Sequence, residues 1–225
     1  MIKKFELDED FEWFLEKFGE PTSRTNVNED TLTKYRGKLP DRLLEYWQEY
    51  GFCGFQDGLF WIVNPEDFEG TLDTWLENTD IPQQDNFHVI ARNAFGELYV
   101  WGEKTGLKYE ITPANAWVIE KKGNEKDIAN NNALDSIQEF FYLQKPKYMD
   151  EYDNEENPLF EPCKILHGAL AYDEMYAFEP ALFLGGEAIL ENTAKVNIFV
   201  HLQVLASFGQ IEVLDHDGLV GKAFG

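Results

Sequence analysis

The chain has 225 residues and a formal net charge of −23, yet 44% of its residues are hydrophobic and 15% are aromatic. This apolar content excludes a disordered acidic tail, because such a tail cannot bury enough apolar surface to fold. The charge disfavours nucleic acid as a ligand, since phosphate groups bind clusters of Lys and Arg, and it fits either a surface kept acidic for solubility or one that attracts a basic partner.

The first third of the chain is predicted to be mainly helical. Residues 8–18 carry aromatic side chains at the spacing of one helical face. A second helix is predicted over residues 41–50, because Pro40 is typical of a helix start and Gly51 of a helix end. Glycine-rich turns then lead into a predicted strand at residues 59–63.

Three or four strands are predicted after a third helix, which begins at Pro65. The strands cover residues 87–92, 97–102, 107–111 and 116–120. Short turns at residues 93–96 and 103–106 indicate an antiparallel meander. Helices followed by a meander, with a further helix at residues 127–142, predict an α+β fold.

The composition changes at residues 145–158, which are polar, acidic and bounded by prolines. Such a segment is typical of a crossing between two cores. The sequence therefore predicts one domain over residues 1–144, with N-terminal helices and the antiparallel meander. A smaller α+β domain is predicted over residues 145–225.

The second domain is predicted to contain a short helix at residues 159–166 and a strand at 175–184. Residues 192–208 are interpreted as a buried helix between an Asn and a Gly, although the alternation within them also fits a strand. A hairpin is expected over residues 211–220, with Asp215-His216-Asp217-Gly218 as its turn.

No catalytic or metal-binding template fits the spacing of the residues, and no cofactor is predicted. The turn at 215–218 resembles the start of a calcium loop but lacks the acidic ligand that closes one. Cys163 and His167 stand four residues apart, which could activate a thiolate, but no third orienting residue is evident. We therefore interpret Cys163 as a buried structural cysteine rather than as a nucleophile.

The strongest candidate site is an acidic, aromatic stretch near the predicted domain boundary, where acids would steer a basic partner and aromatic rings would supply contact area. The alternative interpretation of the stretch is a solvated linker. Its acidic members are Asp150, Glu151, Asp153, Glu155, Glu156 and Glu161, and its aromatic members are Tyr148, Tyr152 and Phe160.

The chain shows no sign of secretion or of a membrane partner. Its first ten residues turn acidic at once instead of apolar, and about 18 consecutive apolar residues, the length of a membrane span, occur nowhere. Cys53 and Cys163 lie far apart and do not form a disulfide framework or a zinc ribbon. We therefore expect a cytoplasmic protein.

Two stretches resemble known domains. Leu39 to Trp47, Tyr50-Gly51-Phe52 and Gly58 to Pro65 are similar to the GAD-like domain, which places that domain in residues 1–144. The stretch from Tyr172 to Leu182, with Leu184-Gly185-Gly186 after it, resembles the domain that ends type VI secretion immunity proteins of the DNase-effector class.

The resemblance implies a non-enzymatic immunity protein that binds and neutralises a co-produced toxin, a basic nuclease, by covering its active cleft. Contacts are expected from the acidic stretch and from Tyr172, Asp173, Glu174 and Tyr176. Two alternatives stay open: a hydrolase that uses carboxylates or the Cys163/His167 pair, and an acidic scaffold that binds a protein other than a toxin.

Overall fold

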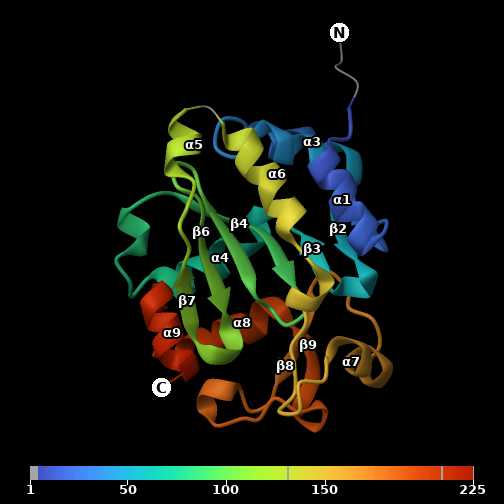
Figure 1. Cartoon of the computed structure of the whole chain (residues 1–225), viewed down its shortest axis with the longest axis vertical. Helices are drawn as coiled ribbons and strands as arrows, with labels where there is room; N and C mark the ends of the chain where they lie inside the picture. Colours follow the sequence, from blue (N-terminus) through green and yellow to red (C-terminus); the bar gives the residue numbers. More distant parts are fainter. Residues whose placement is uncertain (1–4, 131, 209, 225) are drawn as a thin grey trace.

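The computed structural model describes residues 5–130, 132–208 and 210–224. Within them, eight strands form one sheet, in which every neighbouring pair is antiparallel except β7 and β10. A two-stranded antiparallel sheet of β8 (Glu174–Phe178) and β9 (Thr193–Asn197) lies beside its lower end (Figure 1). In spatial order the large sheet consists of β1 (Ser23–Thr25), β2 (Phe52–Phe55), β3 (Phe60–Ile62), β4 (Phe87–Asn93), β5 (Leu98–Gly102), β6 (Gly106–Thr112), β7 (Trp117–Glu120) and β10 (Glu212–Leu214).

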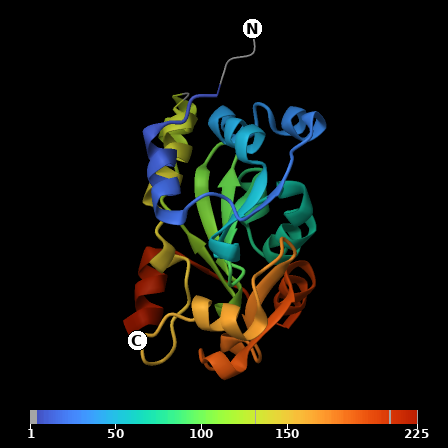
Figure 2. The same ribbon diagram turned by 90° about the vertical axis from the view of Figure 1, so that its right-hand side faces the viewer.

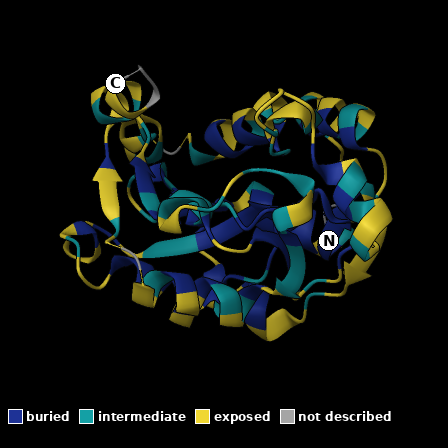
Figure 3. Ribbon diagram, turned by 90° about the horizontal axis from the view of Figure 1, so that it is seen from below, coloured by how far each residue is buried: buried dark blue, intermediate teal, exposed yellow. Residues whose placement is uncertain are grey.

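Helices cover both faces of the large sheet, so the predicted α+β fold is confirmed. Figure 2 shows α1 and α6 on one side of the strands and α4 and α8 on the other. In Figure 3 the central strands are largely dark blue, and exposed residues lie on the outer helices and loops. The helices are α1 (Glu9–Phe18), α2 (Glu29–Tyr35), α3 (Asp41–Tyr50), α4 (Pro65–Leu76), α5 (Glu125–Ala129), α6 (Ala133–Leu143), α7 (Phe160–His167), α8 (Ile198–Phe208) and α9 (His216–Phe224).

An aromatic cluster attaches α1, α3 and α6 to the sheet. The ring of Phe11 stacks on Tyr46 of α3 at 4.0 Å between centroids and meets Phe141 of α6 edge-on at 4.9 Å. Phe14 contacts Phe55 of β2 edge-on at 4.9 Å. Each such pair contributes about 0.5–1.5 kcal/mol beyond its buried area. The first helix is therefore held by residues distant in the chain, of which Phe141 is the most remote.

The C-terminal segment is packed against the N-terminal one through α4 and α8. The indole N–H of Trp75 donates to the carbonyl of Leu202 at 3.1 Å, and Phe68 packs on Phe199 with 5.0 Å between ring centroids. In addition, β10 pairs with β7 and completes the sheet that the earlier segments build. The division into residues 1–144 and 145–225 stays a prediction, but the core runs through both segments without interruption.

Most predicted elements of the first 120 residues are present, while β1, α2 and β2 were not predicted. All three are short, and the exposed strand β1 has no apolar alternation to signal it. The predicted helix at 127–142 is interrupted between α5 and α6, where the N–H of Asn130 bonds back to the carbonyl groups of Lys126 and Asp127. Asn has a low helix propensity, which explains the break.

Three predictions for the last 50 residues are corrected. The strand at 175–184 ends at Phe178, because Pro180 cannot donate to a strand ladder. Residues 193–197 form β9, so the helix predicted over 192–208 begins only at Ile198. At this start, the side-chain oxygen of Asn197 accepts the N–H of Val200 at 3.1 Å.

The hairpin predicted at 211–220 is also wrong. Residues 212–214 form β10, which pairs with β7 in parallel, and a helix follows in place of a second strand. The carboxylate of Asp215 accepts the N–H of Gly218 at 2.8 Å, which is the hydrogen bond of a helix N-cap. The sequence Asp-His-Asp-Gly therefore starts α9 and does not turn a hairpin.

Within the described residues, no helix is both long enough and apolar enough to cross a membrane.

The hydrogen bond between Trp75 and Leu202 predicts a difference between two tryptophan substitutions. Trp75 and Trp47 are both fully buried, but the indole N–H of Trp47 has no partner among the described residues. Trp75→Phe should therefore lower the free energy of unfolding by about 1 kcal/mol more than Trp47→Phe. Urea denaturation of both variants measures this difference, and equal losses would contradict a link between α4 and α8 through this bond.

Candidate partner-binding site

The predicted acidic stretch folds into a loop that is anchored to the start of α7. The carboxylate of Asp150 accepts the N–H groups of Leu159 at 3.2 Å and of Phe160 at 2.8 Å. Burial raises the pKa of Asp150, and these two N–H donors partly oppose that rise. Asp150 therefore stabilises the start of a helix and is not free to contact a partner.

Glu151 is only partly exposed, so the stretch is not a freely solvated linker over its whole length. Desolvation of its carboxylate, reinforced by the charge of Asp150, raises the pKa of Glu151 to about 7. The neighbouring side chain of Met149 is buried, and its sulfur accepts a hydrogen bond from the hydroxyl of Tyr99 at 3.3 Å. This end of the loop therefore packs against β5.

The outer part of the loop is exposed. The carboxylate of Asp153 accepts the N–H groups of Glu155 and Asn157, both at 2.8 Å, and these hydrogen bonds lower the pKa of Asp153. They hold a tight turn whose tip carries the exposed side chains of Glu155 and Glu156. The turn thus presents two carboxylates to solvent on a fixed backbone.

The helix that follows adds an exposed apolar pair that the sequence analysis missed. Phe160 and Cys163 point into the core, whereas Ile165 is 83% exposed and Leu166 is 57% exposed. A helical wheel drawn from the buried residues would have placed both outside. Glu161 is exposed on the same helix, where its carboxylate lies 2.7 Å from the amine of Lys164.

We define the α7 surface as Glu155, Glu156, Glu161, Ile165 and Leu166. Two large aliphatic side chains in water are unfavourable unless something covers them. Exposed carboxylates occur on the same helix, at Glu161, and on the turn that precedes it in the chain, at Glu155 and Glu156. The α7 surface can therefore bind a partner whose own surface offers both an apolar patch and basic side chains.

The other four predicted contact residues are mostly committed to the fold. Tyr176 is fully buried and donates its hydroxyl proton to the carbonyl of Gly168 at 2.8 Å, so its ring cannot reach a partner. The hydroxyl of Tyr172 donates to Asp67 at 2.9 Å and accepts the N–H of Asn64 at 3.0 Å. Glu174 pairs with Lys195 at 3.2 Å, and only Asp173 is exposed.

Arg92 positions the turn that carries these residues. Its side chain is completely buried, lies over the ring of Trp61 at 4.8 Å and donates to the carbonyl of Tyr172 at 2.8 Å. A second, longer hydrogen bond of 3.4 Å reaches the carbonyl of Ala171. Burial without a carboxylate within salt-bridge distance lowers the pKa of Arg92 to about 9. The turn before β8 is therefore fixed from the large sheet.

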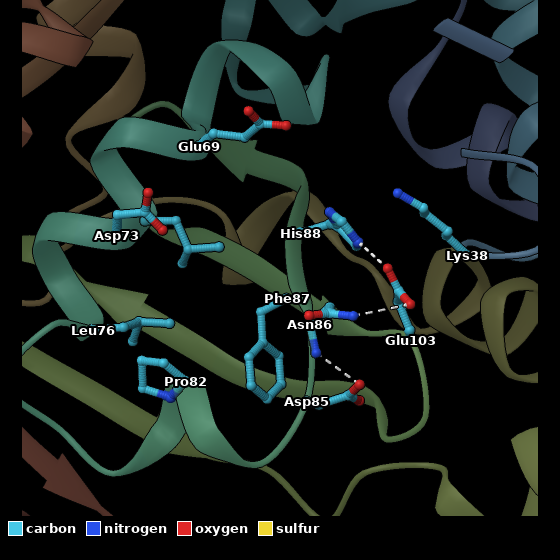
Figure 4. Close-up of a pocket in the computed structure, with 11 residues that line it drawn as sticks. Lys38, Glu69, Asp73, Leu76, Pro82, Asp85, Asn86, Phe87, His88 and Glu103 are labelled. Atoms are coloured by element: carbon cyan, nitrogen blue, oxygen red, sulfur yellow. Dashed lines mark hydrogen bonds and ion pairs between the residues drawn. The ribbon is translucent and has the colours of Figure 1, made fainter. Parts of the chain in front are cut away.

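A second acidic surface, which was not predicted, lies in a cleft beside α4 (Figure 4). The cleft has a volume of about 470 Å³. Glu69 and Asp73 of α4 form one wall, and His88 of β4 lies opposite, 3.0 Å from the carboxylate of Glu103. Leu76 lies on the lower wall. We call this feature the α4 cleft.

Two side chains that line the α4 cleft are already engaged within the fold. Glu69 is already paired with Lys34 at 2.9 Å, and His88 packs edge-on against Tyr35 at 5.3 Å between ring centroids. Among the described residues, no group of His, Cys, Asp or Glu is arranged to hold a metal ion. Glu69 and Asp73 stand four residues apart in α4, and this helical spacing could have predicted an acidic wall from the sequence.

The Cys163/His167 pair does not form a catalytic dyad. The imidazole of His167 bonds to the hydroxyl of Thr193 at 3.0 Å instead of to the thiol. Burial raises the pKa of Cys163, so the thiol stays protonated at neutral pH and is a poor nucleophile. This removes the nucleophile that the hydrolase alternative named.

The comparisons with known proteins agree with the predicted resemblance. Residues 9–115 match the GAD-like domain, and residues 134–209 match the family described as the C-terminal domain of T6SS immunity protein Tdi1. The two matches follow one another along the chain in the predicted order. No curated protein is similar enough to the chain to count as a match.

A solved structure, "Crystal structure of Atu4351 from Agrobacterium tumefaciens", is similar to the chain with a TM-score of 0.76. The two sequences are 21% identical, and the similarity covers 92% of each chain. Because the identity is low, this likeness supports the fold alone.

The burial of Glu151 predicts a pH dependence of stability. Between pH 4.5 and about 7 the carboxyl group is protonated in the folded state and ionised in the unfolded state, so the free energy of unfolding falls as pH rises through this window. Glu151→Gln should flatten this fall and raise the stability at pH 8 by on the order of 2 kcal/mol.

Urea denaturation of the wild type and of Glu151→Gln at pH 5 and pH 8 measures the effect. Glu155→Gln removes the same charge from an exposed side chain and is the matched control. Equal stability gains for the two variants at pH 8 would show that net charge, and not burial of Glu151, is responsible.

Proposed function

We propose that this chain, in which a GAD-like domain precedes the C-terminal domain of a T6SS immunity protein, is a cytoplasmic immunity protein that binds and neutralises a toxin. The observation that carries the proposal is the match of residues 134–209 to the immunity-protein family. The toxin is a nuclease effector, and inhibition consists of covering its active cleft. The protein itself performs no chemistry in this role.

The charge of the chain supports a nuclease as the partner. A nuclease needs a basic groove to hold phosphate groups, and a chain with a net charge of −23 is attracted to such a groove. Complementary charges of this kind mainly raise the association rate, up to about 10⁸–10⁹ M⁻¹s⁻¹ at low salt. A basic toxin would thus be captured quickly after it forms or enters the cell.

The α7 surface is the contact that we propose. It lies within the segment that matches the immunity-protein family, and it combines exposed carboxylates with the aliphatic side chains of Ile165 and Leu166. Such a combination lets charge set the approach while the apolar pair holds the complex after docking. The α4 cleft, in contrast, lies within the GAD-like match.

Two sets of substitutions test the proposed contact. Glu155→Lys/Glu156→Lys should lower the association rate with the toxin encoded beside this protein by about tenfold at low salt, since it reverses the steering charge. Ile165→Ala should leave that rate unchanged and weaken the equilibrium affinity by about tenfold, or about 1.4 kcal/mol, through faster dissociation. Surface plasmon resonance with the purified toxin at several salt concentrations separates the two effects.

The matched control is Glu12→Lys/Glu16→Lys on α1, which changes the net charge by the same amount on exposed residues far from α7 (Figure 1). An equal loss of association rate in the control would show that overall charge alone steers binding. A Glu69→Lys/Asp73→Lys variant in the α4 cleft extends the comparison. If only that variant lost binding, the toxin would bind the cleft and the assignment to α7 would be wrong.

Inhibition itself is measured as loss of nuclease activity when the two purified proteins are mixed. Full activity of the toxin at saturating concentrations of this protein would overturn the proposed neutralisation. Tight binding to a non-toxic neighbour would instead support the scaffold alternative.

A further inference from the structure

Helix α8 is apolar on the side that faces solvent as well as on the side that faces the core. Its inner side supplies three buried side chains, those of Ile198, Leu202 and Leu205. Its outer side carries Val200, Val204 and Phe208, which are 62%, 42% and 68% exposed. Residues four positions apart lie on one face of a helix, so these three form a continuous row. A helix that is apolar all round is normally buried all round, but here the fold covers one side alone.

The adjacent helix α4 has an ordinary polar outer side. Its exposed charged residues are Asp67, Glu69 and Asp73. The sequence of α8, in contrast, contains no Asp, Glu, Lys or Arg. The apolar row is therefore a property of α8 and not of the whole layer of helices on this face of the sheet.

The start of α8 is fixed to the turn before β8. The N–H of Ile198 donates to the carbonyl of Asp173 at 2.9 Å, and the side-chain amide of Asn197 donates to the carboxylate of Asp173 at 3.3 Å. Asp173 is the predicted contact residue of this turn that stays exposed, and it lies at one end of the apolar row. We define the α8 surface as Asp173, Val200, Val204 and Phe208.

The surroundings of the α8 surface are acidic. Lys195 is the only Lys or Arg between Ile165 and Gly221, and its amine is paired with Glu174 at 3.2 Å. The acidic residues of the same stretch are Asp173, Glu174, Glu179, Glu187, Glu191, Glu212, Asp215 and Asp217. The charge of Glu179 opposes the fall in the pKa of His201 on α8 that burial causes. A molecule that covers the apolar row therefore meets negative charge around it.

The α7 surface alone is too small for a stable complex. Stable protein–protein interfaces bury about 800 Å² and about 20–30 residues on each side. The α7 surface consists of Glu155, Glu156, Glu161, Ile165 and Leu166. A toxin that docks on it must therefore contact further residues of this chain.

Helix α8 is placed to provide such a contact. In Figure 1 α7 and α8 both lie at the lower end of the molecule, with β8 and β9 between them, and β9 contacts both helices. All of α8 also lies within residues 134–209, which match the immunity-protein family.

We propose that the α8 surface is a second contact for the toxin and binds a short amphipathic helix with basic side chains beside its apolar ones. The row from Val200 to Phe208 is about 12 Å long, which matches the apolar anchors that a partner helix presents over two turns. The anchors pack on this row, and a basic side chain pairs with Asp173. This inference rests on the proposed function, because the occupant is a segment of the same toxin.

Charge and area disfavour the other occupants of an apolar row. A second copy would bring together two chains of net charge −23, and three apolar side chains fall far short of the about 800 Å² per partner that a stable dimer buries. Helices that lie on membranes carry Lys and Arg on their polar side, and anionic lipids would be repelled by the acids around α8. A basic partner gains from both the apolar row and the acids.

Variants of the apolar row test the proposal with the purified toxin. Val204→Ser/Phe208→Ser should weaken the affinity at least about tenfold and raise by the same factor the concentration that inhibits half of the nuclease activity. Leu134→Ser/Leu143→Ser on α6 is the matched control, because these side chains are 38% and 55% exposed and α6 lies across the sheet from α8 (Figure 2). The control should bind like the wild type.

Surface plasmon resonance and a nuclease assay measure the two quantities. Unchanged binding by Val204→Ser/Phe208→Ser, or an equal loss in the α6 control, would overturn the proposal. Urea denaturation of both variants checks that they are folded.

Asp173→Asn tests the basic character of the occupant. Asn keeps an oxygen that accepts the hydrogen bond from Asn197 and removes only the charge. The variant should bind the toxin about threefold more weakly at low salt, and the difference should shrink as salt rises. No loss of affinity, or a loss that is independent of salt, would contradict a basic partner.

The remaining outcomes separate this inference from the proposed function. Light scattering should show a monomer in the absence of toxin. A dimer that Val204→Ser/Phe208→Ser dissociates, or binding to phosphatidylglycerol vesicles that this variant loses, would assign α8 to another occupant and overturn the proposal. If the wild type neither bound nor inhibited the toxin, both conclusions would fail. If it did both, and the α8 variants matched it, this inference alone would fail.

Discussion

The arrangement of the C-terminal segment depends on the hydrogen bonds that the buried guanidinium of Arg92 donates to the turn before β8. The guanidinium extends from the middle of the large sheet, rests on Trp61 and holds two carbonyl groups of the turn before β8. Its hydrogen-bond acceptors among the described residues are the backbone carbonyls of Asn93, Ala171 and Tyr172. Removing a charge from water is costly, so its hydrogen bonds to backbone carbonyls must offset that cost. The turn is consequently held in one position relative to the sheet.

That position determines where α7 lies. Gly168 follows α7 and its carbonyl receives the hydroxyl of Tyr176, so the helix, the turn and β8 form one unit. The exposed aliphatic pair of α7 is a consequence of this packing, because the opposite side of the helix supplies Phe160 and Cys163 to the core. A rigid attachment of this kind suits a binding surface, since little conformational entropy is lost when a partner docks.

The net charge of −23 has to be offset within the fold. Self-repulsion of the acids disfavours the compact state, and the aromatic core that joins α1, α3 and α6 to the sheet opposes it. Several lysines offset part of this charge in ion pairs, as Lys164 does with Glu161 and Lys195 with Glu174.

The sequence by itself determined the helices α1, α3 and α4, the meander from β4 to β7, the α+β class and the family resemblance, because these depend on local periodicity and on short motifs. Only the tertiary structure decided that Tyr176 is buried and Glu151 partly so, that Asp150 caps a helix, and that residues 193–197 pair with β8. These outcomes depend on contacts between segments distant in the chain. An acidic side chain has the same appearance in a sequence whether it faces water or caps a helix, and only packing distinguishes the two.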